Sequence, residues 1–203
     1  MNQCDDLPMT ALRYFVPGAL LTFVVACTPV CLAQSMSPNE VRSMTAADFQ
    51  RHIDEEGAQQ FVQRLIKDID PHSPEEPNYD IVLEHVAEGS NGWLHAAAQI
   101  GPYTDASFSQ GIRVAIADAL VVNPTGVLKM IGTESHFDDA CGYPFVRQTD
   151  TYMQRHKREA LAALNRVHQP ALEAKKESCR KSLMDMPTAT ASGVSPTPSE
   201  MRN

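Results

Sequence analysis

The sequence has no apolar run long enough to cross a bilayer near its start. The stretch from Tyr14 to Val25 is about 12 residues long and contains Pro17 and Gly18, whereas a membrane-spanning helix needs roughly 20 apolar residues. This length is typical of the apolar core of a signal peptide, and the positive charge of Arg13 precedes it. The sequence therefore predicts a leader, followed by a mature chain without a transmembrane segment.

Two processing sites fit this leader. The letters "CLA", which end at Ala33, place small residues where a signal peptidase requires them. The letters "VVAC", which end at Cys27, resemble a bacterial lipobox, in which that cysteine becomes the lipidated first residue. Asp5 and Asp6 are unusual in the charged start of a leader, and translation from Met9 would remove them. We expect a signal peptide over residues 1–33, with lipidation of Cys27 as the alternative.

Basic residues are few. The chain has 17 Lys and Arg against 25 Asp and Glu, a formal net charge of -8, and no basic cluster. Such a chain is poorly suited to binding nucleic acid or an anionic membrane surface. We therefore predict no nucleic-acid partner.

Cysteines are also few, and most of the five lie in the leader. Cys4, Cys27 and Cys31 precede the predicted cleavage site, which leaves Cys141 and Cys179. An even pair in an oxidising compartment favours one disulfide between them. Closing a loop of about 38 residues stabilises a fold by roughly 4 kcal/mol in the chain-entropy treatment.

Runs that alternate apolar and polar residues are scarce, and helical periodicity dominates. The clearest apolar stripe places Phe108, Ile112, Ala115, Ile116 and Ala119 on one helix face. The pattern predicts an all-α protein of about eight short helices packed as antiparallel hairpins, an arrangement compatible with an α-repeat. The expected helical segments are 45–56, 58–69, 78–89, 92–100, 106–122, 123–132, 149–169 and 171–183.

The composition changes at both ends of this helical region. The tail has almost nothing apolar to bury, so it is predicted to be disordered. The predicted organisation is a signal peptide at 1–33, a linker at 34–44, a helical domain at 45–184 and a disordered tail at 185–203.

No "GxSxG", "HExxH", "CxxC" or phosphate-binding glycine loop is present. We therefore predict no catalytic, cofactor-binding or metal-ligating residue. His85 and His95 flank a turn, but their spacing fits no known ligand pattern. The segment from residue 134 to 139 gathers Glu134, His136 and Asp138 beside Asp139, which could serve a divalent cation or a hydrolase. A solvated acidic loop is the interpretation that we prefer.

Aromatic residues make up only 6% of the chain, with one tryptophan. Trp93 could anchor a protein partner, but Ala97 and Ile100 share its helix face, so we favour a place in the core. Tyr103, in the "GPYTDA" turn, is the better candidate for an exposed contact with a partner.

A resemblance to a group of known proteins rests on three sequence features. They are the run "GWLHAAAQIGPYTDASFSQGIRVAIADALVVNPTGVLKMIG", the letters "CGYPF" that follow it, and a final helix pair containing "ESC". Over residues 78–183 it resembles small exported all-helical proteins of Gram-negative bacteria whose function is unassigned. The resemblance implies a helical fold and a setting outside the cytoplasm. It supplies no catalytic residue.

These observations together predict a non-catalytic protein-interaction module that is periplasmic or secreted. Stacked helix hairpins present extended faces suited to protein partners. One alternative is an immunity-type inhibitor, because an acidic surface complements a basic toxin. Others are an envelope hydrolase that uses the acidic 134–139 loop, and an outer-membrane lipoprotein anchored through Cys27.

Overall fold

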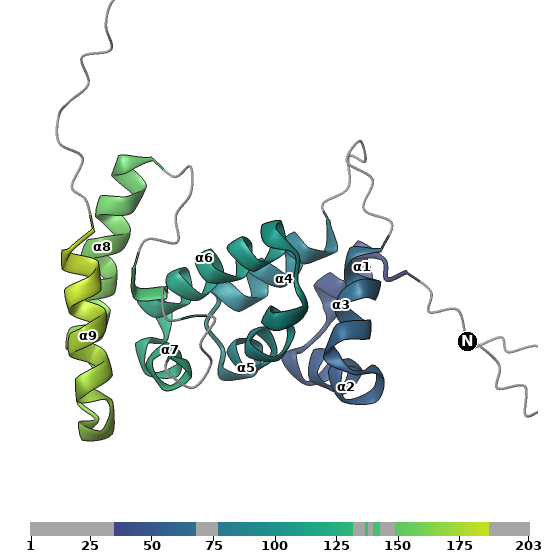
Figure 1. Ribbon diagram of the computed structural model, residues 1–203, viewed down its shortest axis with the longest axis horizontal. Coiled ribbons are helices and arrows are strands. Elements are labelled where there is room, and N and C mark those ends of the chain that lie inside the picture. The colour runs from purple at the N-terminus through teal and green to yellow at the C-terminus, as the bar shows by residue number, and fades with distance from the viewer. Residues whose placement is uncertain (1–34, 68–76, 132–136, 138–139, 143–148, 187–203) are drawn as a thin grey trace, which may run out of the picture. The chain divides into compact units, whose positions relative to one another are not determined.

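The computed structural model describes residues 35–67, 77–131, 137, 140–142 and 149–186, and within these residues it is all-helical, with nine α-helices and no strand (Figure 1). This confirms the predicted all-α class. The α-helices are α1 (Pro38–Ser43), α2 (Ala46–Glu56), α3 (Ala58–Ile66), α4 (Asn78–Ala87), α5 (Asn91–Ile100), α6 (Ala106–Val122), α7 (Pro124–Met130), α8 (Asp150–Asn165) and α9 (Glu173–Met184). Two short 3-10 turns, η1 (Gly101–Tyr103) and η3 (Pro170–Leu172), precede α6 and α9.

The helices begin where side chains can satisfy their first amide groups. Thr45 and Asp48 form a reciprocal capping box at the start of α2. Asp105 Oδ1 accepts a hydrogen bond from the Phe108 amide at 2.8 Å and starts α6. Asn123 accepts from the Gly126 amide at 2.9 Å, and Pro124 occupies the first position of α7. The predicted starts at Asp105 and Asn123 are confirmed.

One helix lies in the segment that we expected to be a linker. Within 34–44, α1 is capped by Ser37, whose hydroxyl accepts from the Glu40 amide at 3.2 Å. Val41 is fully buried, and α1 packs against α4. The linker prediction was therefore wrong for residues 38–43, because a helix this short buries too few side chains to give a periodic pattern.

The boundary predicted for the tail is wrong at Met186. Met186 is buried, although it falls within the 185–203 segment. Residues 187–203 lie outside the described residues, as does the predicted signal peptide at 1–33.

The helices pack mainly on partners that are not their immediate neighbours in the chain. The most extensive contacts join α6 to α4 and to α8, and α2 also packs against α5 (Figure 1). Between α4 and α5 the chain turns at Gly89, whose φ of 74° is a left-handed conformation that glycine adopts without strain. The predicted apolar stripe of α6 is buried, as are Trp93 and Ile100 of α5. In the part of the chain that the structure describes, no helix has the length and apolar character needed to span a membrane.

Candidate functional site

The predicted disulfide is present. Cys141 and Cys179 are joined, with their Cα atoms 4.9 Å apart, and both residues are buried. The bond ties the segment before α8 to the middle of α9. Helices α8 and α9 also pack against each other, and α8 supplies part of the lining of the pocket described next.

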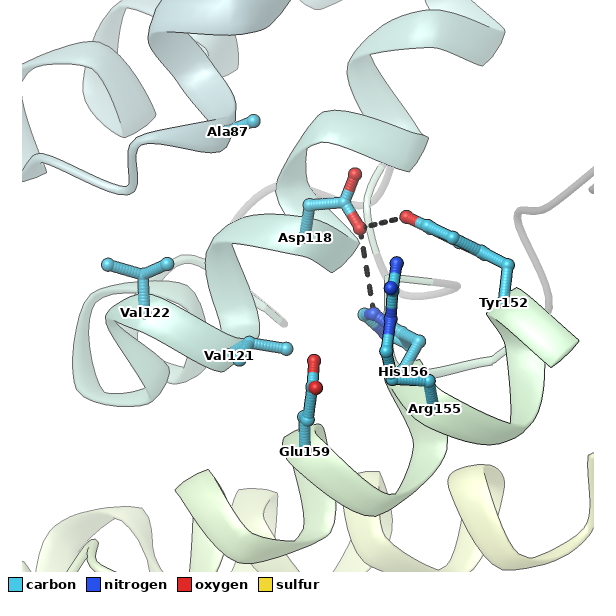
Figure 2. Close-up of a pocket in the computed structure, with 8 residues that line it drawn as sticks. All are labelled: Ala87, Asp118, Val121, Val122, Tyr152, Arg155, His156 and Glu159. Carbon is cyan, nitrogen blue, oxygen red and sulfur yellow. Dashed lines mark hydrogen bonds and ion pairs between the residues drawn. The ribbon is translucent and has the colours of Figure 1, made fainter.

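A pocket with a volume of about 300 Å³ lies where α6 meets α8, near the end of α4 (Figure 2). Its wall has an apolar part from α4 and α6 and a polar part from α6 and α8. The lining residues are Ala87, Asp118, Val121, Val122, Tyr152, Arg155, His156 and Glu159.

Asp118 organises the polar part of this pocket. Its Oδ1 accepts a hydrogen bond from the Tyr152 hydroxyl at 2.5 Å and lies 3.5 Å from Nδ1 of His156. Tyr152 and His156 are four residues apart on α8, so both face α6. Figure 2 shows the second oxygen of Asp118 directed away from both partners. The Asp118 side chain is 34% exposed, so α8 fixes this carboxylate while leaving part of it open to the pocket.

The protonation states of the two α8 side chains follow from burial. Burial, reinforced by the hydrogen bond to Asp118 and its charge, raises the pKa of Tyr152 far above the ordinary value for tyrosine. Burial lowers the pKa of His156, although the charges of Asp118 and Glu159 act in the opposite direction. At neutral pH Tyr152 is therefore a hydrogen-bond donor and His156 is neutral.

Arg155 and Glu159 complete the polar part of the wall. The Arg155 guanidinium lies over the Tyr152 ring, 5.5 Å from its centre, a cation–π arrangement. Glu159 is exposed and one helical turn further along α8. With Asp118 and Glu159 negative, Arg155 positive and His156 neutral, the pocket carries a net charge of about -1.

The lining residues limit which nucleophiles the pocket itself can supply. None of the eight lining residues is a serine, threonine or cysteine that Asp118 and His156 could activate as a nucleophile. The raised pKa of Tyr152 opposes formation of a phenolate. The groups therefore offer fixed hydrogen-bonding and charge positions beside an apolar wall.

The two histidines that flank the turn after α4 do not converge. The His85 ring stacks on Trp93 with centres 4.6 Å apart, and its Nδ1 is 3.6 Å from Glu88. His95 is exposed, and its Nε2 lies 2.7 Å from the amide nitrogen of Gln99. Across the described ranges, no three His, Cys, Asp or Glu side chains are arranged to hold a metal ion.

A second polar cluster joins α2 to α3. Both carboxylate oxygens of Glu56 accept hydrogen bonds from Arg64, and His52 Nδ1 is 3.1 Å from Glu56. The His52 ring stacks on Phe61, with centres 5.5 Å apart, and Arg64 lies over the same ring. Because these charges are paired with one another, the cluster holds two helices together.

The two predicted aromatic contacts have different surroundings. Trp93 is only 5% exposed and packs against Phe49, so it occupies the core position that we preferred, and a partner contact through its ring stays an untested alternative. Helix periodicity directs it inward, against Phe49 of α2. Tyr103 is 49% exposed, and its contact with a partner remains a prediction.

Several other predicted residues lie outside the described part of the chain. They are Cys27, the alternative lipidation site, and the loop residues Glu134, His136, Asp138 and Asp139. The alternatives that depend on them, a lipid anchor and a hydrolase, stay predictions.

Sequence reasoning missed the pocket altogether. Asp118 is the only acidic side chain within the 17 residues of α6 and interrupts an otherwise apolar run. Tyr152 and His156 share one face of α8 through their spacing of four. Those two signals were visible, but only the packing of α6 on α8 joins them, across 34 residues of chain.

A comparison with protein families, curated proteins and solved structures finds no match to this chain.

Proposed function

We propose that this protein is an exported, non-catalytic protein-interaction module whose partner contacts the face formed by α6 and α8. The exposure of Val122 carries the proposal. This side chain is 63% exposed at the apolar edge of the pocket. Covering an exposed apolar side chain beside ready-made polar groups is the usual way in which a binding surface gains affinity.

The fixed side chains of the pocket support the same role. The hydrogen bond from the Tyr152 hydroxyl holds Asp118 in one orientation before any partner arrives, with His156 buried beside it. A partner that meets fixed groups loses less conformational freedom on binding, which favours affinity. Both α8 side chains lie on a helix that packs against α9, and the disulfide ties α9 to the segment before α8.

Export is the other part of the proposal. A buried disulfide persists in an oxidising compartment, such as the periplasm or the cell exterior, and is rare in the cytosol. Mass spectrometry of the mature protein from its source cells tests this. Cleavage after Ala33 gives an unmodified chain starting at residue 34, whereas lipidation gives a heavier chain starting at Cys27. An N-terminus at Met1 or Met9 would contradict export.

The interaction is tested by placing a photo-crosslinking amino acid at one exposed apolar position at a time in the full chain. We choose Val122 in the pocket wall, Met184 at the end of α9, and Tyr103 in the turn before α6, all exposed. After illumination of living source cells, we expect a crosslinked protein of defined mass from position 122. Met184 is the matched control, since it is 52% exposed but lies outside the pocket.

Each outcome has a distinct meaning. A crosslink at position 122 but not at 184 supports the proposed face. A crosslink at position 103 alone keeps an interaction module but moves the contact to the turn predicted from sequence. The absence of a crosslinked protein at all three positions would overturn the proposal.

A further inference from the structure

The pocket between α6 and α8 has two chemically different walls. Val121 and Val122 of α6, with Ala87 of α4, form an apolar edge, and the carboxylates of Asp118 and Glu159 line the same space (Figure 2). A ligand that fits both walls has an aliphatic part and a positively charged end.

Only one of the two carboxylate oxygens of Asp118 is open to a ligand. Its Oδ1 is the acceptor for Tyr152 and the atom nearest His156, and Oδ2 has no hydrogen bond or ion pair with any described residue. A guanidinium group prefers to bind both oxygens of one carboxylate in parallel. An ammonium group is a compact charge with three rotatable donors, and it can use single oxygens of separate carboxylates. The geometry at Asp118 therefore favours lysine over arginine.

The net negative charge of the pocket also favours a positively charged ligand. Among the eight lining residues, only Arg155 opposes Asp118 and Glu159, since His156 is buried and neutral at pH 7. The chain as a whole carries -8, so its field attracts a basic partner over longer distances.

We propose that this pocket receives a lysine side chain from a basic segment of the protein partner. The proposal rests on the proposed function, which it makes more specific. The four methylene groups of the lysine pack along Val121 and Val122, and its ammonium group meets Asp118 and Glu159. Long basic side chains commonly bury their aliphatic stem in this way while keeping the charge among polar groups.

Arg155 competes with the incoming lysine. It lies four residues before Glu159 on α8, a spacing at which an arginine can pair with a glutamate in solution. In this structure it lies over Tyr152 instead. Removing its charge should therefore strengthen the binding of a lysine, whereas removing the charge of Glu159 should weaken it. A residue with a purely structural role would not give this reversal of sign.

The test is a titration of the full mature protein, followed by the NMR signals of the Val121 and Val122 methyl groups. The probe is a tripeptide, acetyl-Ala-Lys-Ala-amide, compared with the same peptide carrying norleucine or arginine. We expect saturable shifts with lysine, weaker binding with arginine, and no saturation with norleucine. Equal affinity for norleucine and lysine would overturn the proposal.

Charge variants sharpen this test. We expect Glu159→Gln to weaken lysine-peptide binding and Arg155→Gln to strengthen it, each on the order of two- to fivefold, the effect of a partly exposed ion pair. Arg158→Gln is the matched control on the same helix, since Arg158 is exposed and does not line the pocket. An Arg155→Gln variant that binds no better than Arg158→Gln would overturn the proposal.

The two proposals fail separately. If position 122 crosslinks a partner but the lysine peptide does not bind, the interaction face stands and the lysine pocket is wrong. If the lysine peptide binds with the expected charge pattern while no position crosslinks a protein, the pocket recognises amines and the interaction module is wrong.

Discussion

The helices before α6 and the α8–α9 pair are stabilised in different ways. In the first region Phe49 packs its ring against Phe61 at 4.7 Å and against Trp93 at 4.9 Å between centres, and all three side chains are buried. Within α8 and α9, no phenylalanine, tyrosine or tryptophan is among the buried residues. The pair uses small and aliphatic side chains, together with the Cys141–Cys179 disulfide.

Lysine side chains also stabilise the α8–α9 pair. Lys157 donates to the carbonyl of Met184 at 2.8 Å, near the end of α9, and Lys176 donates to the carbonyl of Val167 at 3.2 Å, after α8. Lys175 donates to the carbonyl of Ile131 at 2.5 Å, after α7. Helix C-termini carry a partial negative charge and unsatisfied carbonyl groups, which a lysine stabilises. A region with little aromatic surface to bury is thus held by a covalent bond and by charges at helix ends.

The largest effect that we expect comes from the aromatic cluster. Replacing Phe49 by alanine should lower the free energy of unfolding by about 3–5 kcal/mol, because it leaves a cavity between two rings. Urea unfolding followed by the fluorescence of Trp93, the one tryptophan, measures it directly. Val122→Ala, at an exposed position, should change the stability by less than about 0.5 kcal/mol. Similar losses for the two variants would contradict the packing described for α2 and α5.

Removing the disulfide should act mainly on the other region. Changing Cys141 and Cys179 together to serine should cost about 2–4 kcal/mol through the greater freedom of the unfolded chain. Hydrogen exchange of the native protein then separates the regions: amides of α8 and α9 should lose protection, and those of α2 and α5 should lose less. A uniform loss of protection across all four helices would show that the two regions unfold as one unit.

Some features of both regions could be predicted from the sequence, and others could not. The stripe on α6, the helix starts at Asp105 and Asn123 and the pairing of the cysteines were predictable, because each depends on local spacing or on a simple count. Helix α1 and the pocket were not. The first is too short to show a period, and the second depends on Asp118 and Tyr152 meeting through the packing of α6 on α8.

A smaller effect should follow from removing the hydroxyl that joins these two helices. Tyr152→Phe leaves the ring in place but removes the donor to Asp118, so we expect a loss of about 1 kcal/mol, as for a typical hydrogen bond in a partly exposed site. Tyr103→Phe, at an exposed turn, is the control and should be neutral. The urea midpoints of both variants, compared with that of the unchanged protein at pH 7, measure these changes in stability. A neutral Tyr152→Phe would mean that this hydrogen bond does not contribute to holding α8 against α6.

The smallest effect is a dependence on pH that arises at the same contact. Burial lowers the pKa of His156 in the folded protein, whereas in the unfolded chain histidine takes up a proton near pH 6.5. Between these two values the unfolded chain binds more protons, so the stability falls as the pH falls. From pH 7 to pH 6 we expect His156 to contribute a loss of a few tenths of a kcal/mol, since one group can change the stability by no more than about 1.4 kcal/mol per pH unit. Above pH 7 this contribution is constant.

Two histidine variants isolate this contribution. His156→Gln cannot take up the proton, so its stability should decline less than that of the unchanged protein between pH 7 and pH 6. His168→Gln, at an exposed position after α8, should keep the full decline. If both variants decline equally, His156 does not carry the pH dependence; if the unchanged protein becomes more stable on acidification, the attraction of Asp118 and Glu159 for a protonated His156 outweighs its burial. The sign of the slope therefore reports directly which of the two forces dominates where α8 meets α6.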